Sequence, residues 1–237
     1  MPLKTPIPPH AWHLLTRLGE AQVLLPATLL AVVMLWRRPD ARSLAAWWMA
    51  LLGAAAGLAV ASKIAFIGWG IGWAEFDFTG MSGHAVFSAA IFPLLMGVLA
   101  SNAPRAFRYL AVAAGCVLAL LIGLSRLVLG AHSVSEVLIG WLVGGAATAA
   151  VLALARLPGD ATDPLVVIVA ALWLIFMPVH APNSRTQALL TRVSLMLSGH
   201  KTPYTRRMMQ RELQRLHRHA PDSKSDARRQ PVALAAL

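Results

Sequence analysis

The chain has 237 residues, of which 57% are hydrophobic and only 13% carry a charge. Soluble domains usually carry about a quarter charged residues, so this composition excludes an ordinary soluble globular protein. The apolar residues are grouped in blocks, several of them near the roughly 20 residues that a helix needs to cross a bilayer. We therefore predict an all-α, polytopic membrane helical bundle with about six transmembrane helices.

The net charge of +11 is unevenly distributed along the chain. From residue 183 onward there are 11 Lys and Arg against three acidic residues, whereas the preceding part has 10 against seven. A basic tail beside a membrane domain favours anionic lipid headgroups, so we expect the bilayer and no nucleic acid as its partner. The single cysteine, Cys116, excludes an intrachain disulfide.

Three regions are expected in chain order. A proline-rich, irregular lead-in covers residues 1–20, a transmembrane domain covers 21–180, and a basic tail covers 181–237. Apolar blocks are predicted at residues 21–36, 44–66, 84–100, 107–124, 134–155 and 164–179. No cleavage site follows the first block, so a retained helix is expected there. In the tail, residues 185–197 are predicted to form a helix on the bilayer surface, or alternatively a solvated basic helix, with disorder after about residue 221.

The basic residues also predict an orientation. Residues 37–42, residues 105–108 and Arg156 would lie on the cytoplasmic side, because Lys and Arg concentrate there. The segments 67–83 and 125–133 then fall together on the opposite side. Six crossings would also place the basic tail on that outer side, against the positive-inside tendency. Tryptophans near both ends of the second block, Trp47 and Trp48 at one and Trp69 and Trp73 at the other, are expected at the two interfaces.

The stretch from Ser125 to Glu136 carries an arginine, a histidine and a carboxylate between two apolar blocks. Ionisable groups are costly at membrane depth and invite a functional explanation. Glu136 lies one helical turn after His132, where a carboxylate fixes the imidazole tautomer and activates its second nitrogen. There is a local alternative, because residues 133–136 read as a capping box and Glu136 is not expected to serve both partners fully. An ordinary interface position is the alternative for His132 itself.

A second stretch, Met81 to His84, opens the third apolar block. Ser82 is suited to the N-cap position, and Gly83 lets the backbone approach a ligand closely. Free N–H groups at a helix start, together with the positive end of the helix dipole, bind phosphate oxygens. The alternative is a capped helix whose first turn contains a histidine, since Ser-Gly-His alone is too short to be specific.

Together the two stretches resemble the type 2 phosphatidic acid phosphatase family, whose second and third motifs are P-S-G-H and S-R-x5-H-x3-D. The second corresponds to residues 81–84 without the proline, and the third to residues 125–136 with Glu136 in place of Asp. The resemblance covers about residues 60–150. It implies that His132 forms a phosphohistidine, that Glu136 orients it, and that His84 protonates the leaving oxygen. It also implies, without a metal or cofactor, a set of residues that hold the phosphoryl oxygens: Lys63, Ser82, Gly83, Ser125 and Arg126.

The first motif of that family, K-x6-R-P, is the main departure. Lys63 fits its lysine, but Gly70 and Ile71 stand where Arg and Pro are expected. No Arg or Lys lies between Lys63 and Arg105 in the sequence, so no nearby residue replaces the missing charge. Losing a guanidinium removes a charge-assisted bidentate contact from a phosphate site. An alternative for Lys63 is an anchor whose ammonium group reaches the membrane interface.

The resemblance implies an integral membrane lipid phosphatase, expected in a bacterial inner membrane with its site facing the periplasm. Its substrate would be a phosphate monoester or pyrophosphate of an anionic phospholipid or an isoprenoid. One alternative is a lipid-phosphate-binding or transport protein without turnover, motivated by the missing Arg-Pro and by Glu136. A vanadate-dependent oxidase is another, because the family shares its fold with haloperoxidases. The sequence does not indicate the oligomeric state.

Overall fold

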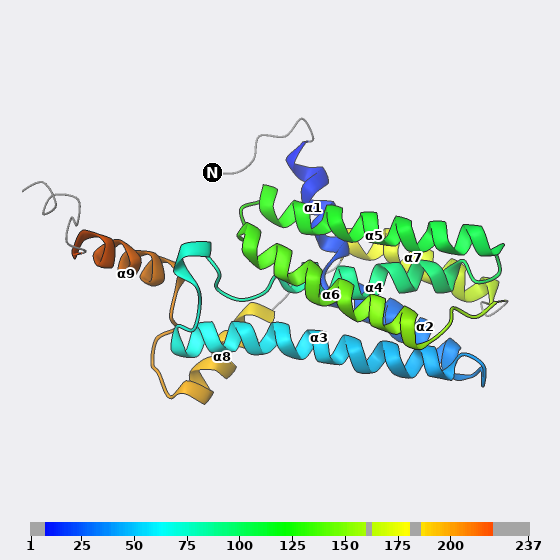
Figure 1. The fold of residues 1–237 in the computed structure, drawn as a ribbon. Helices are drawn as coiled ribbons and strands as arrows, with labels where there is room; N and C mark the ends of the chain where they lie inside the picture. The colour runs from blue at the N-terminus through cyan, green and yellow to red at the C-terminus, as the bar shows by residue number, and fades with distance from the viewer. Residues whose placement is uncertain (1–7, 160–162, 181–185, 220–237) are drawn as a thin grey trace, which may run out of the picture.

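The computed structural model describes residues 8–159, 163–180 and 186–219. Over these ranges the chain forms nine α-helices and one 3-10 helix, with an isolated bridge between Trp73 and Phe78 and no longer strand. The elements are α1 (Pro9–Leu18), α2 (Ala21–Trp36), α3 (Arg42–Trp69), η1 (Ala74–Phe76), α4 (Gly83–Leu99), α5 (Arg105–Val128), α6 (Val134–Leu154), α7 (Pro164–His180), α8 (Thr186–Ser198) and α9 (Arg206–His219) (Figure 1). The predicted all-α helical bundle is confirmed.

Helix α4 is the centre of the bundle. Twelve of its 17 residues are buried, including Phe92 and Leu94, and it packs against α5, α6, α3 and α2. Small residues on α6 allow the closest approach, since Gly140 and Gly144 lie directly against the backbone at the start of α4. Close backbone approach through small residues is the usual way that membrane helices pack. The start of α4 and the start of α6 are therefore held together.

Each predicted apolar block forms a helix, but the helices differ in length. Among the described residues, α3, α5 and α6 are long and apolar enough to cross a membrane, and α1 with α2 forms a fourth candidate bent by 41°. Helices α4 and α7 are apolar but have only 17 residues each, which is roughly 25 Å of helix against a hydrocarbon core of about 30 Å. Six crossings remain a prediction.

The predicted irregular lead-in is wrong over residues 9–18, which form α1. The prolines there mark the helix start, because Pro is well suited to the first helical position, where no N–H partner is needed. Trp12 and Thr16 of α1 are buried, and α1 packs against α5 and α7. Residues 9–18 are therefore part of the bundle, and they lie at the end where segments 67–83 and 125–133 meet.

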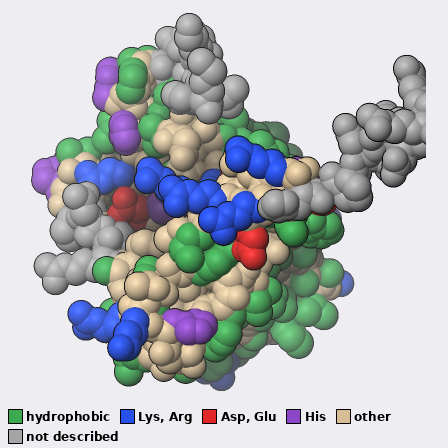
Figure 2. Space-filling model, turned by 90° about the vertical axis from the view of Figure 1, so that its left-hand side faces the viewer, with side chains coloured by type: hydrophobic (Ala, Val, Ile, Leu, Met, Phe, Trp, Pro, Cys, Tyr) green, Lys and Arg blue, Asp and Glu red, His purple; other side chains and the backbone are tan. Residues whose placement is uncertain are grey.

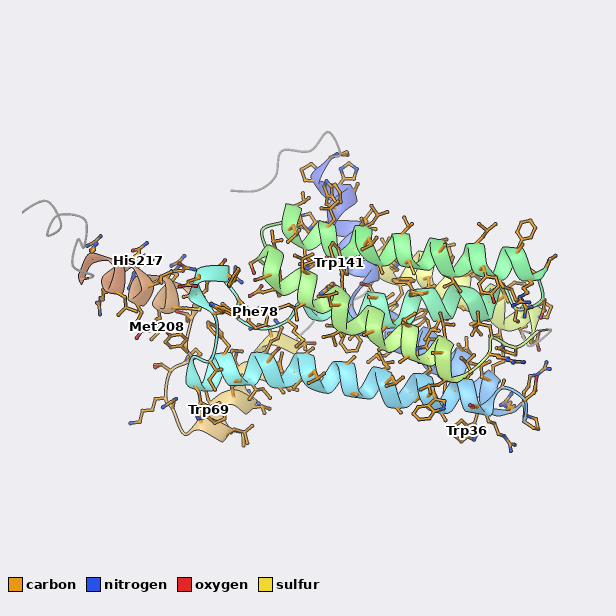
Figure 3. The ribbon with its side chains drawn as sticks, viewed as in Figure 1. Trp36, Trp69, Phe78, Trp141, Met208 and His217 are labelled. Atoms are coloured by element: carbon orange, nitrogen blue, oxygen red, sulfur yellow. The ribbon has the colours of Figure 1, made fainter. Side chains whose placement is uncertain are left out.

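The connections fall at two opposite ends, as the charge pattern predicts. The loops after α2, α4 and α6 share one end (Figure 1), where the Arg108 Nη1 donates to the carbonyl oxygen of Pro158 at 3.0 Å. The exposed Trp36 and Trp69 lie at opposite ends (Figure 3). Trp48 was expected at an interface, and this is wrong. Its side chain is fully buried, and its indole N–H donates to the carbonyl oxygen of Ala90 at 3.1 Å.

The described part of the tail contains two helices. Helix α8 packs against α3 and leaves apolar side chains exposed, including Leu189 and Met196, so its position on the bilayer stays a prediction. Helix α9 was not predicted. It packs against η1 at the same end as the segments 67–83 and 125–133 (Figure 1). The predicted disorder after residue 221 lies outside the described residues.

Candidate active site

The start of α6 places His132 against a buried carboxylate. Ser133 is the N-cap of α6, and its hydroxyl accepts from the Glu136 N–H at 3.4 Å while the Glu136 carboxylate accepts from the Ser133 N–H at 3.2 Å. This is the predicted capping box. The same carboxylate oxygen, Oε2, lies 2.6 Å from Nδ1 of His132. A carboxylate at Nδ1 leaves Nε2 of the neutral ring as the free lone pair.

Glu136 therefore serves the cap and the histidine together, and the expectation that it would not is wrong. The physical reason is that Oε2 accepts from both His132 and Ser133, so Oε1 remains for other donors. Oε1 accepts from the Thr79 N–H at 2.8 Å, from the Thr79 hydroxyl, and from Nη2 of Arg206 at 2.6 Å. The side chain of Glu136 is fully buried. A buried carboxylate with all its acceptor positions used has one orientation.

His132 is nine-tenths covered, with 12% of its side chain exposed. Burial lowers the pKa of His132 below its ordinary value of 6.5, because desolvation penalises the charged ring. The hydrogen bond to Glu136 opposes this shift, and the nearby positive charge of Lys63 reinforces it. At neutral pH the ring is neutral, which is the form that can act as a nucleophile.

The start of α4 contributes Ser82, Gly83 and His84. Ser82 occupies the N-cap position as predicted, but its hydroxyl makes no capping hydrogen bond. Its N–H instead donates to the carbonyl oxygen of Glu136 at 3.1 Å, which ties the two helix starts together. His84 lies within electrostatic range of His132, Lys63 and Arg126. The first turn of α4 therefore borders the same space as the pair of His132 and Glu136.

Two polar atoms at this site are buried without a partner. Among the described residues, Oγ of Ser82 and Nε of Arg126 have no hydrogen-bond partner. The backbone links both residues to the pair of His132 and Glu136. The His132 N–H donates to the Arg126 carbonyl oxygen at 3.3 Å, and the Ser82 N–H donates to the Glu136 carbonyl oxygen. Buried donors are normally satisfied, so two unpartnered donors on residues tied to His132 and Glu136 point to an anionic ligand that accepts from both.

The side chains of the remaining motif residues differ in whether they already have a partner within the protein. Nη1 of Arg126 donates to the hydroxyl of Thr16 at 2.8 Å, which anchors the arginine on α1. The buried Ser125 hydroxyl donates to the carbonyl oxygen of Ile122, so it faces its own helix. Lys63 lies in the last two turns of α3 and lines a cavity of about 290 Å³ together with Thr79 and Arg206.

The sequence reasoning missed Thr16, Thr79 and Arg206. Thr16 and Arg206 lie outside the motifs. No short-range pattern connects Thr16 to Arg126 or Arg206 to Glu136. A signal for α9 does exist: Thr205 can cap a helix, and residues 206–219 are rich in good helix formers. Among the acidic residues of the loop before α4, Asp77 accepts from Arg206 at 3.1 Å, whereas Glu75 is exposed.

The charged side chains on the surface at this end are mostly basic (Figure 2). Lys and Arg side chains form a band across it, with histidine and acidic side chains beside the band (Figure 2). A basic face attracts anionic substrates and anionic headgroups. Within the described ranges, no three His, Cys, Asp or Glu side chains are grouped so that they could hold a metal ion.

Comparison with known proteins gives two similarities. A family model described as the PAP2 superfamily matches residues 66–158, which include the second and third motifs and begin just after Lys63. A Klebsiella pneumoniae protein described as "Uncharacterized 22.5 kDa protein in cps region" is 36% identical over 199 residues, which is 82% of this chain and 95% of that protein. No solved structure matches the chain.

Proposed function

This chain belongs to the PAP2 superfamily, whose members are phosphoesterases, and we propose that it hydrolyses a phosphate monoester or pyrophosphate of a membrane lipid. The observation that carries the proposal is the pair of buried, unpartnered donors on Ser82 and Arg126 next to a histidine held by a buried carboxylate. Apolar helices around the site support a substrate that is anchored in a bilayer. A lipid substrate would bring its headgroup to the helix ends from within the bilayer.

The proposed reaction has two steps. Nε2 of His132 attacks phosphorus, the bond from phosphorus to the lipid oxygen breaks, and that oxygen takes a proton from His84. Water then attacks the phosphohistidine, gives a proton to His84 and releases inorganic phosphate, which restores both histidines. Ser82, Gly83, Arg126 and Lys63 hold the phosphoryl oxygens, because phosphoryl transfer depends mainly on positioning and charge neutralisation. Ser125 joins them only if its hydroxyl turns away from Ile122.

We further propose a bacterial inner membrane location, with the site at the periplasmic headgroup level. Two observations support this. The relative that is similar over most of the chain comes from a bacterium. The loops rich in arginine lie at the end of the bundle opposite the site, and such loops favour the cytoplasmic side.

The test is phosphate release by the purified protein in detergent from phosphatidate and from an isoprenoid pyrophosphate, with a metal chelator present. We expect wild-type protein to release phosphate and His132→Ala to lose at least about a thousandfold in rate. His217→Ala is the matched control, because this histidine is exposed at the far part of α9 (Figure 3). Full activity of His132→Ala would refute the mechanism. Tight binding of these lipids without turnover would favour a binding or transport protein instead.

A further inference from the structure

The end of α3, where the family's Arg-Pro is missing, is covered by the tail. Gly70 has a positive φ of 71° and ends the helix in a left-handed conformation, which a side chain would disfavour. The ring of Tyr204 packs over it, so that an added Cβ would lie 3.2 Å from the ring. Ile71 donates its N–H to the carbonyl oxygen of Ala65 at 3.2 Å, which a proline could not do.

Several contacts hold the tail in this place. The Tyr204 N–H donates to the carbonyl oxygen of Ile67 at 2.9 Å, and its ring lies edge-on to Phe66 at 5.5 Å between centroids. Met209 of α9 is 5% exposed and packs with Phe66 and Ile67. The tail is therefore docked by apolar contacts and by the backbone, independently of the charged groups discussed next.

This docking brings one arginine to the site. Nη2 of Arg206 lies 2.6 Å from Oε1 of Glu136, and Nη1 lies 3.1 Å from the carboxylate of Asp77. Gln210, one turn later on α9, donates to the same Asp77 carboxylate at 2.8 Å. Both terminal nitrogens of Arg206 are thus engaged with carboxylates, so its contact to the reaction runs through Glu136.

The need for such a contact follows from the length of the side chain. Glu136 has one more rotatable bond than the aspartate of the family motif, so its carboxylate is harder to fix in one orientation. Contacts from Thr79 and Arg206 to Oε1 fix that oxygen, which aims Oε2 at His132. Outer partners of this kind hold and orient the groups that do the chemistry.

We propose that Arg206 is a positioning residue of the active site, supplied by the C-terminal tail, which holds the longer carboxylate of Glu136 in line with His132. This rests on the proposed function, because it assigns a role within the same reaction. The tail is then a working part of the enzyme, and its partner is the chain's own active-site loop.

The experiment compares Arg206→Ala, Arg206→Lys and Arg207→Ala in the full-length protein, with kcat, KM and the thermal midpoint measured for each. Arg207 is the matched control, because it is the adjacent arginine on α9 and its side chain is exposed. We expect Arg206→Ala to lower kcat on the order of ten- to a hundredfold, with KM changed by less than about twofold. Arg206→Lys should recover part of the loss, and Arg207→Ala should behave as wild type.

A second comparison separates positioning from structural support. In a Glu136→Asp background the carboxylate is shorter and withdraws from Arg206, so Arg206→Ala should cost less than about half as much on a logarithmic scale as in wild type. Should Arg206→Ala fold poorly, the kcat of Arg206→Lys at an unchanged thermal midpoint decides. Wild-type kcat in Arg206→Ala, or an equal loss in Arg207→Ala, would overturn the proposal while leaving the phosphatase function intact. A wild-type protein without phosphate release would instead overturn the function itself.

Discussion

The close approach of α4 and α6 makes Gly144→Ala a direct test of how the site is built. A Cβ added at Gly144 would overlap the carbonyl oxygen of Val86 and lie 2.9 Å from the Cβ of Ala89. Carbon atoms prefer separations of about 3.5–4.0 Å, so the two helices would have to move apart by about 1 Å. Gly145→Ala is the matched control, since an added Cβ there has no atom within 4 Å among the described residues.

The expected magnitude follows from the difference between these two variants. Both replace a helical glycine by alanine, which favours the helix by about 1 kcal/mol, so that contribution cancels. What remains is the overpacking at residue 144, which typically costs about 1–3 kcal/mol. For a chain of this size, each kcal/mol corresponds to about 2–4 °C in the thermal midpoint. Gly144→Ala should therefore melt at a lower temperature than Gly145→Ala in the same detergent.

The same displacement of α4 from α6 should also lower the reaction rate. Helix α4 carries His84 and helix α6 carries Glu136, so moving the helices apart separates the proposed proton donor from the carboxylate that orients the nucleophile. A misplacement of about 1 Å can cost about a hundredfold in rate, and the phosphate-release assay measures it. Equal thermal midpoints and equal rates for Gly144→Ala and Gly145→Ala would refute the packing described here.

The pKa of His132 predicts a pH profile for the enzyme. The unpartnered hydroxyl of Ser82 predicts that its removal changes KM without lowering the thermal midpoint. Because burial holds the pKa of His132 below 6.5, the acidic limb of kcat/KM, which reports protonation of this nucleophile, should lie below pH 6.5. Glu136→Gln removes the negative charge whose interaction with His132 raises this pKa, so the acidic limb of its residual activity should move to lower pH; a shift upward contradicts the assignment. Ser82→Ala removes a buried, unpartnered hydroxyl, so the thermal midpoint should hold or rise while KM rises roughly two- to tenfold. In contrast Ser88→Ala, which removes a hydroxyl bonded to the carbonyl oxygen of Ala85, should lower the thermal midpoint and leave KM unchanged.

The parts of the site that could be predicted from the sequence are local ones. His132 and Glu136 are one helical turn apart, and Ser133 and Glu136 form a cap, so spacing alone brings these groups together. The helix starts at Ser82 and Ser133 are also local, because each follows from a change from polar to apolar residues. Their meeting in space follows from the alternation of short loops and long helices, which fixes which helix ends are neighbours.

The parts that could not be predicted depend on contacts between distant residues. Arg206 and Glu136 are 70 residues apart, and Arg126 and Thr16 are 110 apart. No periodicity or motif connects residues at these separations. The glutamate in the third motif motivated the alternative of a binding or transport protein without turnover, whereas the structure gives its oxygen Oε1 three donors. A departure from a motif can thus be compensated by a segment that the motif does not include.

The order in which a ribosome makes this chain gives these long separations a consequence. Thr16 is among the first residues to leave the ribosome, and Arg206 emerges only after all the apolar helices have been synthesised. A nascent chain that has inserted the second and third motifs still lacks the arginine that contacts Glu136. The full catalytic rate would then arrive with the last described helix, so shortened translation products should be present in the membrane yet hydrolyse its lipids on the order of ten- to a hundredfold more slowly.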